Sequence, residues 1–210
     1  MARLKNGILG HITGRVGDMI YYILNGKLVA RGVSKTSTVP PSELQLASRA
    51  RFAIANSFTK SVKDFVKVSF GEAKGPGQNA YSKAISTVLL NALSGAYPEY
   101  TLDYSKVILS LGSLQPAREP SAELQNGEVV FTWLSNNKWP VAADRVMMIA
   151  YCEELEEIAY SVGGQKRIVG RDVLNIPQEW SGQRVHLYIS FCSEDQKKMA
   201  NSEYLGNLII

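Results

Sequence analysis

From Lys106 to the C-terminus, apolar residues recur at every second position in several short segments, and this pattern most narrows the folds open to the chain. Turn signals separate the segments, among them Asn126-Gly127 and Gly163-Gly164. Short alternating segments in such a series are typical of an antiparallel β-sandwich. We expect strands at Lys106–Leu111, Glu128–Leu134, Arg145–Cys152, Ile158–Ser161, Arg167–Leu174, Arg184–Cys192 and Tyr204–Ile210.

Two of these segments predict which side chains face the sandwich core. In Glu128–Leu134 and in Arg184–Cys192 the odd-numbered residues are apolar. Alternate residues of a strand point to opposite faces of its sheet. We therefore expect Trp133 in the core, and we expect His186 to face solvent.

The segment before the sandwich carries helical periodicity. We expect a helix from about Ser42 to Phe70, because Ile54, Phe58, Val62 and Phe65 fall on one face of it. A second helix is expected over Gln78–Leu93, between segments rich in glycine and proline. The opposite face of the first helix is basic, and we take it as a candidate anion-binding surface formed by Arg49, Lys60, Lys63 and Lys67.

The first 35 residues predict β structure. The segments Asp18–Leu24 and Lys27–Val33 flank Asn25-Gly26, which is a strong signal for a tight hairpin turn. Both faces of this hairpin are apolar, and an isolated hairpin is only marginally stable in water. One face could rest on the helix of the same chain while the other meets a neighbouring copy. The candidate oligomer-interface residues are Ile20, Tyr22 and Leu24.

Charge is distributed unevenly along the 210 residues. Residues 1–105 carry a formal balance of +7 and residues 106–210 a balance of −3, for a net charge of +4. Opposite potentials could steer neighbouring copies together, or the basic half could bind an anionic partner such as nucleic acid. Ordinary surface charge is the third interpretation. Further residues that could contact phosphates or bases are Arg3, Lys5, Arg15, Lys27, Arg31, Lys35, Tyr21, Tyr22 and Phe52.

No motif in the sequence identifies an enzymatic chemistry. The glycines of residues 7–17 lack the spacing of a phosphate-binding loop or a dinucleotide fingerprint. The two histidines, His11 and His186, have no partner at metal-ligand spacing, and the glutamates of residues 153–157 suit a solvated turn. We therefore expect no enzyme, no catalytic residue, no cofactor and no metal site.

The two cysteines, Cys152 and Cys192, each end a predicted strand. In an immunoglobulin-like order these strands are antiparallel neighbours, so their ends lie at opposite edges of the sheet. That separation exceeds the roughly 7 Å over which two Cα atoms can be bridged. We expect two free thiols, consistent with a reducing compartment.

Two stretches carry a family resemblance: GILGHITGRVGDMIYYILNGKLVAR, residues 7–31, and VHLYISFCSEDQKKMANSEYLG, residues 185–206. They are similar to an uncharacterised family of Bacteroidetes proteins, a domain of unknown function, and with the helical segment the resemblance covers nearly the whole chain. It implies no established activity. Residues 106–210 separately resemble an immunoglobulin or fibronectin type III sandwich, on the segments around Trp133 and from Tyr188 to Tyr204, without the disulfide of antibody domains.

These observations predict an α+β protein with a basic hairpin-plus-helices region over residues 1–105 and an antiparallel immunoglobulin-like sandwich over residues 106–210. The leading hypothesis is a non-enzymatic structural or interaction protein that forms homo-oligomers, in a virion or a cell-associated assembly. The alternative is a cytosolic nucleic-acid-binding protein. No run of about 20 apolar residues suits a membrane span, and no segment resembles a classical signal peptide. We expect a cytoplasmic location, or an assembly exported without such a signal.

Overall fold

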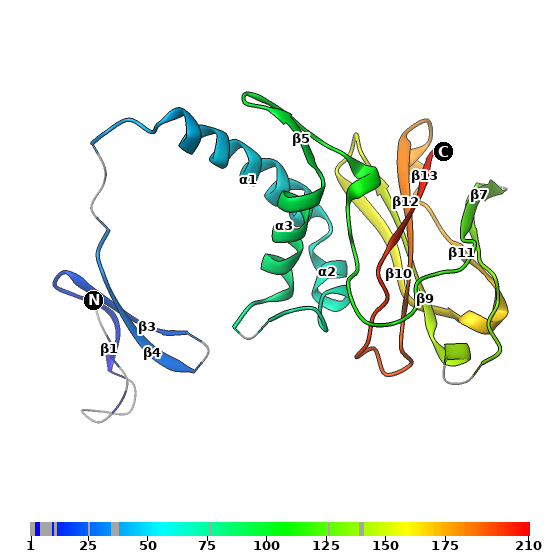
Figure 1. Cartoon of the computed structure of the whole chain (residues 1–210), viewed down its shortest axis with the longest axis horizontal. Coiled ribbons are helices and arrows are strands. Elements are labelled where there is room, and N and C mark those ends of the chain that lie inside the picture. The colour runs from blue at the N-terminus through cyan, green and yellow to red at the C-terminus, as the bar shows by residue number, and fades with distance from the viewer. Residues whose placement is uncertain are drawn as a thin grey trace. The chain divides into compact units, whose positions relative to one another are not determined.

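The computed structural model describes residues 3–4, 10, 12–24, 26–34, 38–75, 77–125, 127–138 and 141–210. The fold is α+β, with antiparallel sheets (Figure 1). The chain divides into two compact units, residues 1–42 and 43–210. The division follows Ser42 rather than residue 105, where the change of periodicity suggested it, because the helices share a hydrophobic core with the sheet that follows them.

The N-terminal unit is an antiparallel sheet in the order β1-β2-β3-β4. The expected hairpin forms one edge of this sheet, as β3 and β4, and Leu24 pairs with Lys27 across a two-residue connection. Gly26 has a φ of 78°, which favours glycine at this turn; Asn25 lies outside the described residues. The strands are β1 (Arg3–Leu4), β2 (Ile12–Val16), β3 (Met19–Leu24) and β4 (Lys27–Gly32).

The helical segment follows with one difference from the sequence prediction. The single helix expected up to Phe70 breaks at Val62, where φ is −94° and ψ is 14°. Asn79 caps the next helix, because its side chain accepts a hydrogen bond of 2.6 Å from the Ser82 amide. The elements are α1 (Glu43–Ser61), α2 (Lys63–Ser69) and α3 (Ala80–Asn91), followed by a hairpin of β5 (Leu93–Ala96) and β6 (Glu99–Leu102).

Two antiparallel sheets form the expected sandwich, in the orders β10-β9-β12-β13 and β11-β8-β7. Trp133 is buried in the core between them, as predicted, together with Phe131 and Phe191. The sequence analysis missed β7. The strands are β7 (Ser121–Gln125), β8 (Glu128–Thr132), β9 (Arg145–Cys152), β10 (Glu157–Lys166), β11 (Arg171–Leu174), β12 (Arg184–Cys192) and β13 (Glu203–Ile209), with short 3₁₀ turns η2 (Tyr104–Lys106), η3 (Val141–Ala143), η4 (Arg167–Val169) and η5 (Gln178–Trp180).

The second face of the four-stranded sheet is also buried. Met147 and Ile149 on β9 and Tyr188 on β12 pack in one cluster with Phe58 and Phe65 from the helices. The prediction that His186 faces solvent is therefore wrong, because the helices cover this face and leave its side chain 5% exposed. Strands β9 and β12 are buried on both sides, as the centre of a layered fold requires.

The segment Lys106–Leu111, expected as a strand, has no strand partner. It runs as an irregular stretch in which Val107 and Leu109 are buried. Its amides bind elsewhere: the Leu109 amide donates to the Ser202 hydroxyl at 2.8 Å, and the Leu111 amide donates to the Ser69 carbonyl at 3.3 Å. Alternating apolar residues here fill the core beneath α2 instead of pairing in a sheet.

Candidate functional site

A groove lined by lysines lies where α1 and α2 meet the start of α3. It holds about 580 Å3, and Lys60, Lys63 and Lys67 line one side of it, with Asn79 and Tyr81 on the other. All three lysines are exposed. The break at Val62 places Lys60 on α1 and the other two on α2, and they still face one hollow. The groove offers ammonium groups to an anion or to a phosphate backbone.

Part of this polar lining already has partners. The Lys67 ammonium binds the Asp64 carboxylate at 2.6 Å, which lowers the pKa of that exposed carboxyl. The Tyr81 hydroxyl donates to the Asn56 side-chain oxygen at 3.0 Å. Arg49, the fourth residue of the predicted surface, is exposed on α1 and does not line the groove. The structure therefore brings together three of the four predicted anion-binding residues.

The sheet of the N-terminal unit has two chemically different faces. Alternation along each strand and the cross-strand register decide which side chains share a face. One face carries no charged side chain among the residues that the structure describes and is named here the apolar face. Its apolar side chains are those of Ile12, Val16, Met19, Tyr21, Ile23, Leu28 and Ala30. Four of these side chains are 38–49% exposed: Val16, Met19, Ile23 and Leu28.

The opposite face, named here the cationic face, carries the three predicted interface residues. Ile20 pairs with both Arg15 and Arg31, Tyr22 pairs with Val29, and Leu24 pairs with Lys27. Ile20, Tyr22 and Arg31 line a hollow of about 490 Å3. The predicted interface residues thus share a face with three cationic side chains, those of Arg15, Lys27 and Arg31. Strand alternation alone did not show this difference between the two faces. Lys5 and Lys35, two other predicted basic contacts, lie outside the described residues.

A cluster of aromatic and ionisable side chains surrounds His186. Its Nδ1 lies 3.0 Å from the Tyr204 hydroxyl and its Nε2 lies 3.3 Å from the Glu153 carboxylate. Burial lowers the pKa of His186, and the carboxylate of Glu153 opposes that shift. Burial also raises the pKa of Tyr151 to about 12, with the Glu156 carboxylate as the next cause. The sequence analysis missed this cluster, because its members lie on four separate elements. His11, the other histidine, lies outside the described residues.

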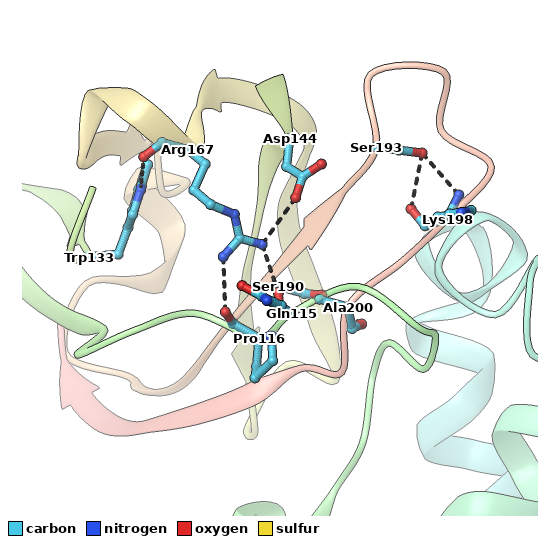
Figure 2. Close-up of polar contacts among 9 residues, drawn as sticks. All are labelled: Gln115, Pro116, Trp133, Asp144, Arg167, Ser190, Ser193, Lys198 and Ala200. Atoms are coloured by element: carbon cyan, nitrogen blue, oxygen red, sulfur yellow. Dashed lines mark hydrogen bonds and ion pairs between the residues drawn. The ribbon is translucent and has the colours of Figure 1, made fainter. Parts of the chain in front are cut away.

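The sequence analysis also missed a buried network around Arg167. Figure 2 shows its guanidinium donating to the Gln115 carbonyl at 2.7 Å and the Pro116 carbonyl at 2.9 Å, and facing the Asp144 carboxylate at 3.4 Å. The guanidinium also lies 3.6 Å from the centre of the Phe191 ring. Burial raises the pKa of Asp144 and lowers that of Arg167. Since the groups bind backbone and each other, the network orders the sandwich loops.

Both cysteines are free thiols, as predicted, and both are buried. Cys152 pairs in register with Val185 and Cys192 with Arg145, so the thiols lie at opposite ends of the β9–β12 pair. Burial raises the pKa of Cys192 to about 11, which disfavours the reactive thiolate. The buried thiols therefore contribute packing rather than a nucleophile.

The glutamates of residues 153–157, at the turn from β9 into β10, make more contacts than a solvated turn requires. Besides Glu153 at His186, the Glu156 carboxylate accepts from the Ser57 hydroxyl at 3.4 Å. The Glu157 carboxylate accepts from the Trp180 indole N–H at 3.2 Å. Among the residues that the structure describes, no three His, Cys, Asp or Glu side chains gather as a metal site. None of the described helices is long and apolar enough to cross a membrane.

Comparison with known proteins yields a family assignment alone. A family model described as "Family of unknown function (DUF6266)" matches residues 11–206. No curated protein and no solved structure matches the chain. The match includes residues of both compact units.

Proposed function

The chain belongs to the DUF6266 family of unknown function, and we propose that it is a non-enzymatic structural or interaction protein that assembles with copies of itself. The N-terminal sheet is the assembly element in this proposal. A bacterial setting follows from the resemblance to Bacteroidetes proteins. The cytoplasm, or an assembly exported without a classical signal, is the proposed location.

The observation that carries this proposal is the exposure of the N-terminal sheet. No side chain among residues 10, 12–24, 26–34 and 38–42 of the N-terminal unit is buried, although the strands are rich in isoleucine, leucine and tyrosine. A small sheet needs a covered apolar face to be stable on its own. Apolar patches of this kind on a protein surface mark interaction sites. The apolar face therefore supports contact with another protein surface.

The apolar inner faces of the helices already pack within the unit of residues 43–210. Phe58, Val62 and Phe65 are buried in the core between the helices and the four-stranded sheet. The outer side of α1 and α3 nevertheless exposes apolar side chains: Leu44 is 84% exposed, Phe52 is 51% exposed and Leu90 is 79% exposed. Phe52 and Leu90 line a shallow hollow of about 230 Å3. This helical patch suits the apolar face of a second copy.

A contact between two different surfaces of neighbouring copies is heterologous, and repeated it gives rings or filaments. Both surfaces lie in the basic half of the chain, residues 1–105, so burial of apolar side chains and not opposite charge would drive this contact. In this assembly, the apolar face of one copy contacts the helical patch of the next copy.

The test is the oligomeric state of the full chain by light scattering over a range of concentrations. We expect Ile23→Asp on the apolar face and Phe52→Asp on the helical patch each to give a smaller species. Removing residues 1–42 should do the same while the remaining unit stays folded by circular dichroism. Thr101→Asp, an exposed position on β6, is the matched control and should leave the assembly intact.

Tyr22→Asp and Leu24→Asp test the cationic face at two of the three residues first predicted for the interface. If these variants weaken assembly and Ile23→Asp does not, the cationic face is the one used. A full-length protein that stays monomeric at high concentration and low salt contradicts self-assembly altogether.

The lysine groove favours a second candidate function, the binding of a nucleic acid or another polyanion. Three ammonium groups in one hollow can contact successive phosphates, and each contact makes affinity fall with salt. Fluorescence anisotropy with single-stranded DNA over a salt series tests this function. Replacing Lys60, Lys63 and Lys67 by glutamine should weaken binding and flatten the salt dependence.

A triple variant at exposed lysines away from the groove, Lys74, Lys138 and Lys198, is the matched control, because it removes the same charge. Equal weakening by both triple variants would mean that net charge, and not the groove, attracts the DNA.

A further inference from the structure

A small aromatic pocket lies between α1, the segment after β6 and the β9–β10 turn. It holds about 180 Å3 and is lined by Phe58, Tyr104, Tyr151 and Glu156, with Ile54 and Leu102 at its sides. Phe58 and Tyr151 are nearly fully buried and form its floor, whereas Tyr104 is half-buried and Glu156 is exposed. The pocket thus combines aromatic walls with a carboxylate at the entrance.

The three rings meet as a corner. The Phe58 ring lies at 69° to Tyr151 and at 67° to Tyr104, with centroids 5.0 Å and 6.2 Å away. The two tyrosine rings are only 34° apart, with centroids separated by 5.6 Å. Rings set in this way present π surfaces from two directions, which is the arrangement that aromatic cages use for cations.

The position of Tyr104 is fixed from behind. Its ring stacks on His186 at 3.9 Å, and its carbonyl accepts a hydrogen bond of 2.8 Å from the Tyr188 hydroxyl. A ring held in this way loses little freedom when a ligand binds, so less binding energy is spent on ordering it. The cage is therefore preorganised.

The charge around the cage is negative. Glu156 lines the pocket, and its carboxylate lies within 3.4 Å of the Ser57 hydroxyl, which orients it. Glu156 and Glu153 also raise the pKa values of Tyr104 and Tyr151, after burial as the main cause for each, so both carboxylates act electrostatically at the two phenols. None of the described side chains that line the pocket is cationic.

We propose that this aromatic pocket binds an organic cation, an alkylammonium or guanidinium group, between the rings of Phe58, Tyr104 and Tyr151 and the carboxylate of Glu156. The volume accommodates one such head group. Cation–π attraction is strongest when the cation leaves water, and the buried floor provides that environment. The residues of the pocket differ from those of the apolar face and the helical patch, so the proposal does not rest on the contact between those two surfaces.

The experiment titrates the full chain with choline, with methylguanidinium and with 3,3-dimethylbutan-1-ol, the neutral isostere of choline. Binding is followed by the NMR signals of the tyrosine rings. We expect one of the cations to bind at least about tenfold more tightly than the neutral alcohol. Equal binding of the alcohol and both cations, or no saturable shift with either cation, overturns the proposal.

Matched variants locate the site. Glu156→Gln should weaken cation binding by about threefold, whereas Glu154→Gln, which removes the same charge from the same turn outside the pocket, should not change it. Tyr104→Leu should abolish the preference for a cation over the alcohol, and Tyr104→Phe should keep it. If Glu154→Gln weakens binding as much as Glu156→Gln, the attraction belongs to the acidic turn and the cage proposal fails.

The cation could belong to a free small molecule or to an arginine or lysine of a second copy. Light scattering with saturating choline distinguishes these sources. Dissociation of an assembled form assigns the pocket to the side chain of a neighbouring copy, and an unchanged oligomeric state assigns it to a small molecule.

Discussion

The imidazole ring of His186 stacks on the phenol ring of Tyr104, with centroids 3.9 Å apart and planes 19° from parallel. Glu153 and Tyr204 contact its two ring nitrogens. Arg184 and Glu154 act on it from a greater distance. Because burial dominates, the pKa of His186 in the folded protein lies below its ordinary value of 6.5.

The lowered pKa predicts that stability falls on mild acidification. Between the folded pKa and 6.5, the unfolded chain binds more protons at this residue than the folded chain. The free energy of unfolding therefore rises with pH across this window by up to about 1.4 kcal/mol per pH unit, and the contribution is complete above 6.5. Urea unfolding at steps between pH 5 and pH 7.5 measures it.

His186→Gln is the control for this prediction, because glutamine keeps a polar side chain without titrating. Its stability should vary less between pH 5 and pH 6.5 than that of the natural chain. Carboxyl groups, including Glu203 with its raised pKa, remain in both proteins and cancel in the comparison. If the free energy of unfolding changed with pH by the same amount in both proteins, His186 would titrate alike in the folded and unfolded states.

Trp133→Ala should destabilise the sandwich by about 3–5 kcal/mol. The indole is 5% exposed, meets the edge of Phe191 at 5.5 Å and donates its N–H to the Arg167 carbonyl at 2.7 Å. Leu134→Ala, at a neighbouring side chain that is 42% exposed, should cost far less. Chemical denaturation compares the two. A loss below about 1 kcal/mol for Trp133→Ala would contradict its place in the core.

Arg167→Met should destabilise the protein by about 3–5 kcal/mol, because it leaves the buried Asp144 carboxylate without its cationic partner. Adding Asp144→Asn removes the orphaned charge. The double variant should therefore be more stable than Arg167→Met alone, which makes the two effects non-additive. Unfolding free energies of the four proteins complete the cycle. Simple additivity would show that the two side chains do not act as a pair.

Both thiols should resist a thiol reagent in the folded protein and react in denaturant without prior reduction. Burial and the pKa of about 11 at Cys192 keep the thiolate scarce, and no disulfide links the pair. A colourimetric thiol assay counts the reactive groups with and without denaturant. Rapid reaction of two thiols in the native protein would mean that β9 and β12 open locally.

Strand prediction succeeded at the two central strands, where β9 is apolar nearly throughout and β12 alternates between apolar and less apolar residues. The bounds of β9 and β12 agree with the predicted Arg145–Cys152 and Arg184–Cys192. It failed at Lys106–Leu111, whose alternation serves the core without a strand partner, and at β7, whose sequence SAELQ has too few apolar residues to show a period. An alternating apolar pattern indicates that a segment is buried. Tertiary contacts decide whether that segment also pairs with a neighbouring strand.

The candidate sites were predictable to different degrees. Helical spacing placed Lys60, Lys63 and Lys67 on one surface, since neighbours on a helix face follow from sequence separation alone. The aromatic pocket was not predictable, because Phe58, Tyr104 and Tyr151 are brought together by packing between distant segments. One feature of the sequence does indicate the burial of His186: β12 carries no charged residue after Arg184.

The double burial of β9 and β12 limits where the chain can be cut. A fragment beginning at residue 106 would retain every sandwich strand yet turn Met147, Ile149 and Tyr188 toward water. Such a fragment should aggregate in solution, whereas a fragment beginning at Glu43 should be folded and monodisperse. The helical layer thus protects the four-stranded sheet from aggregation, because it covers an apolar face that would otherwise be exposed.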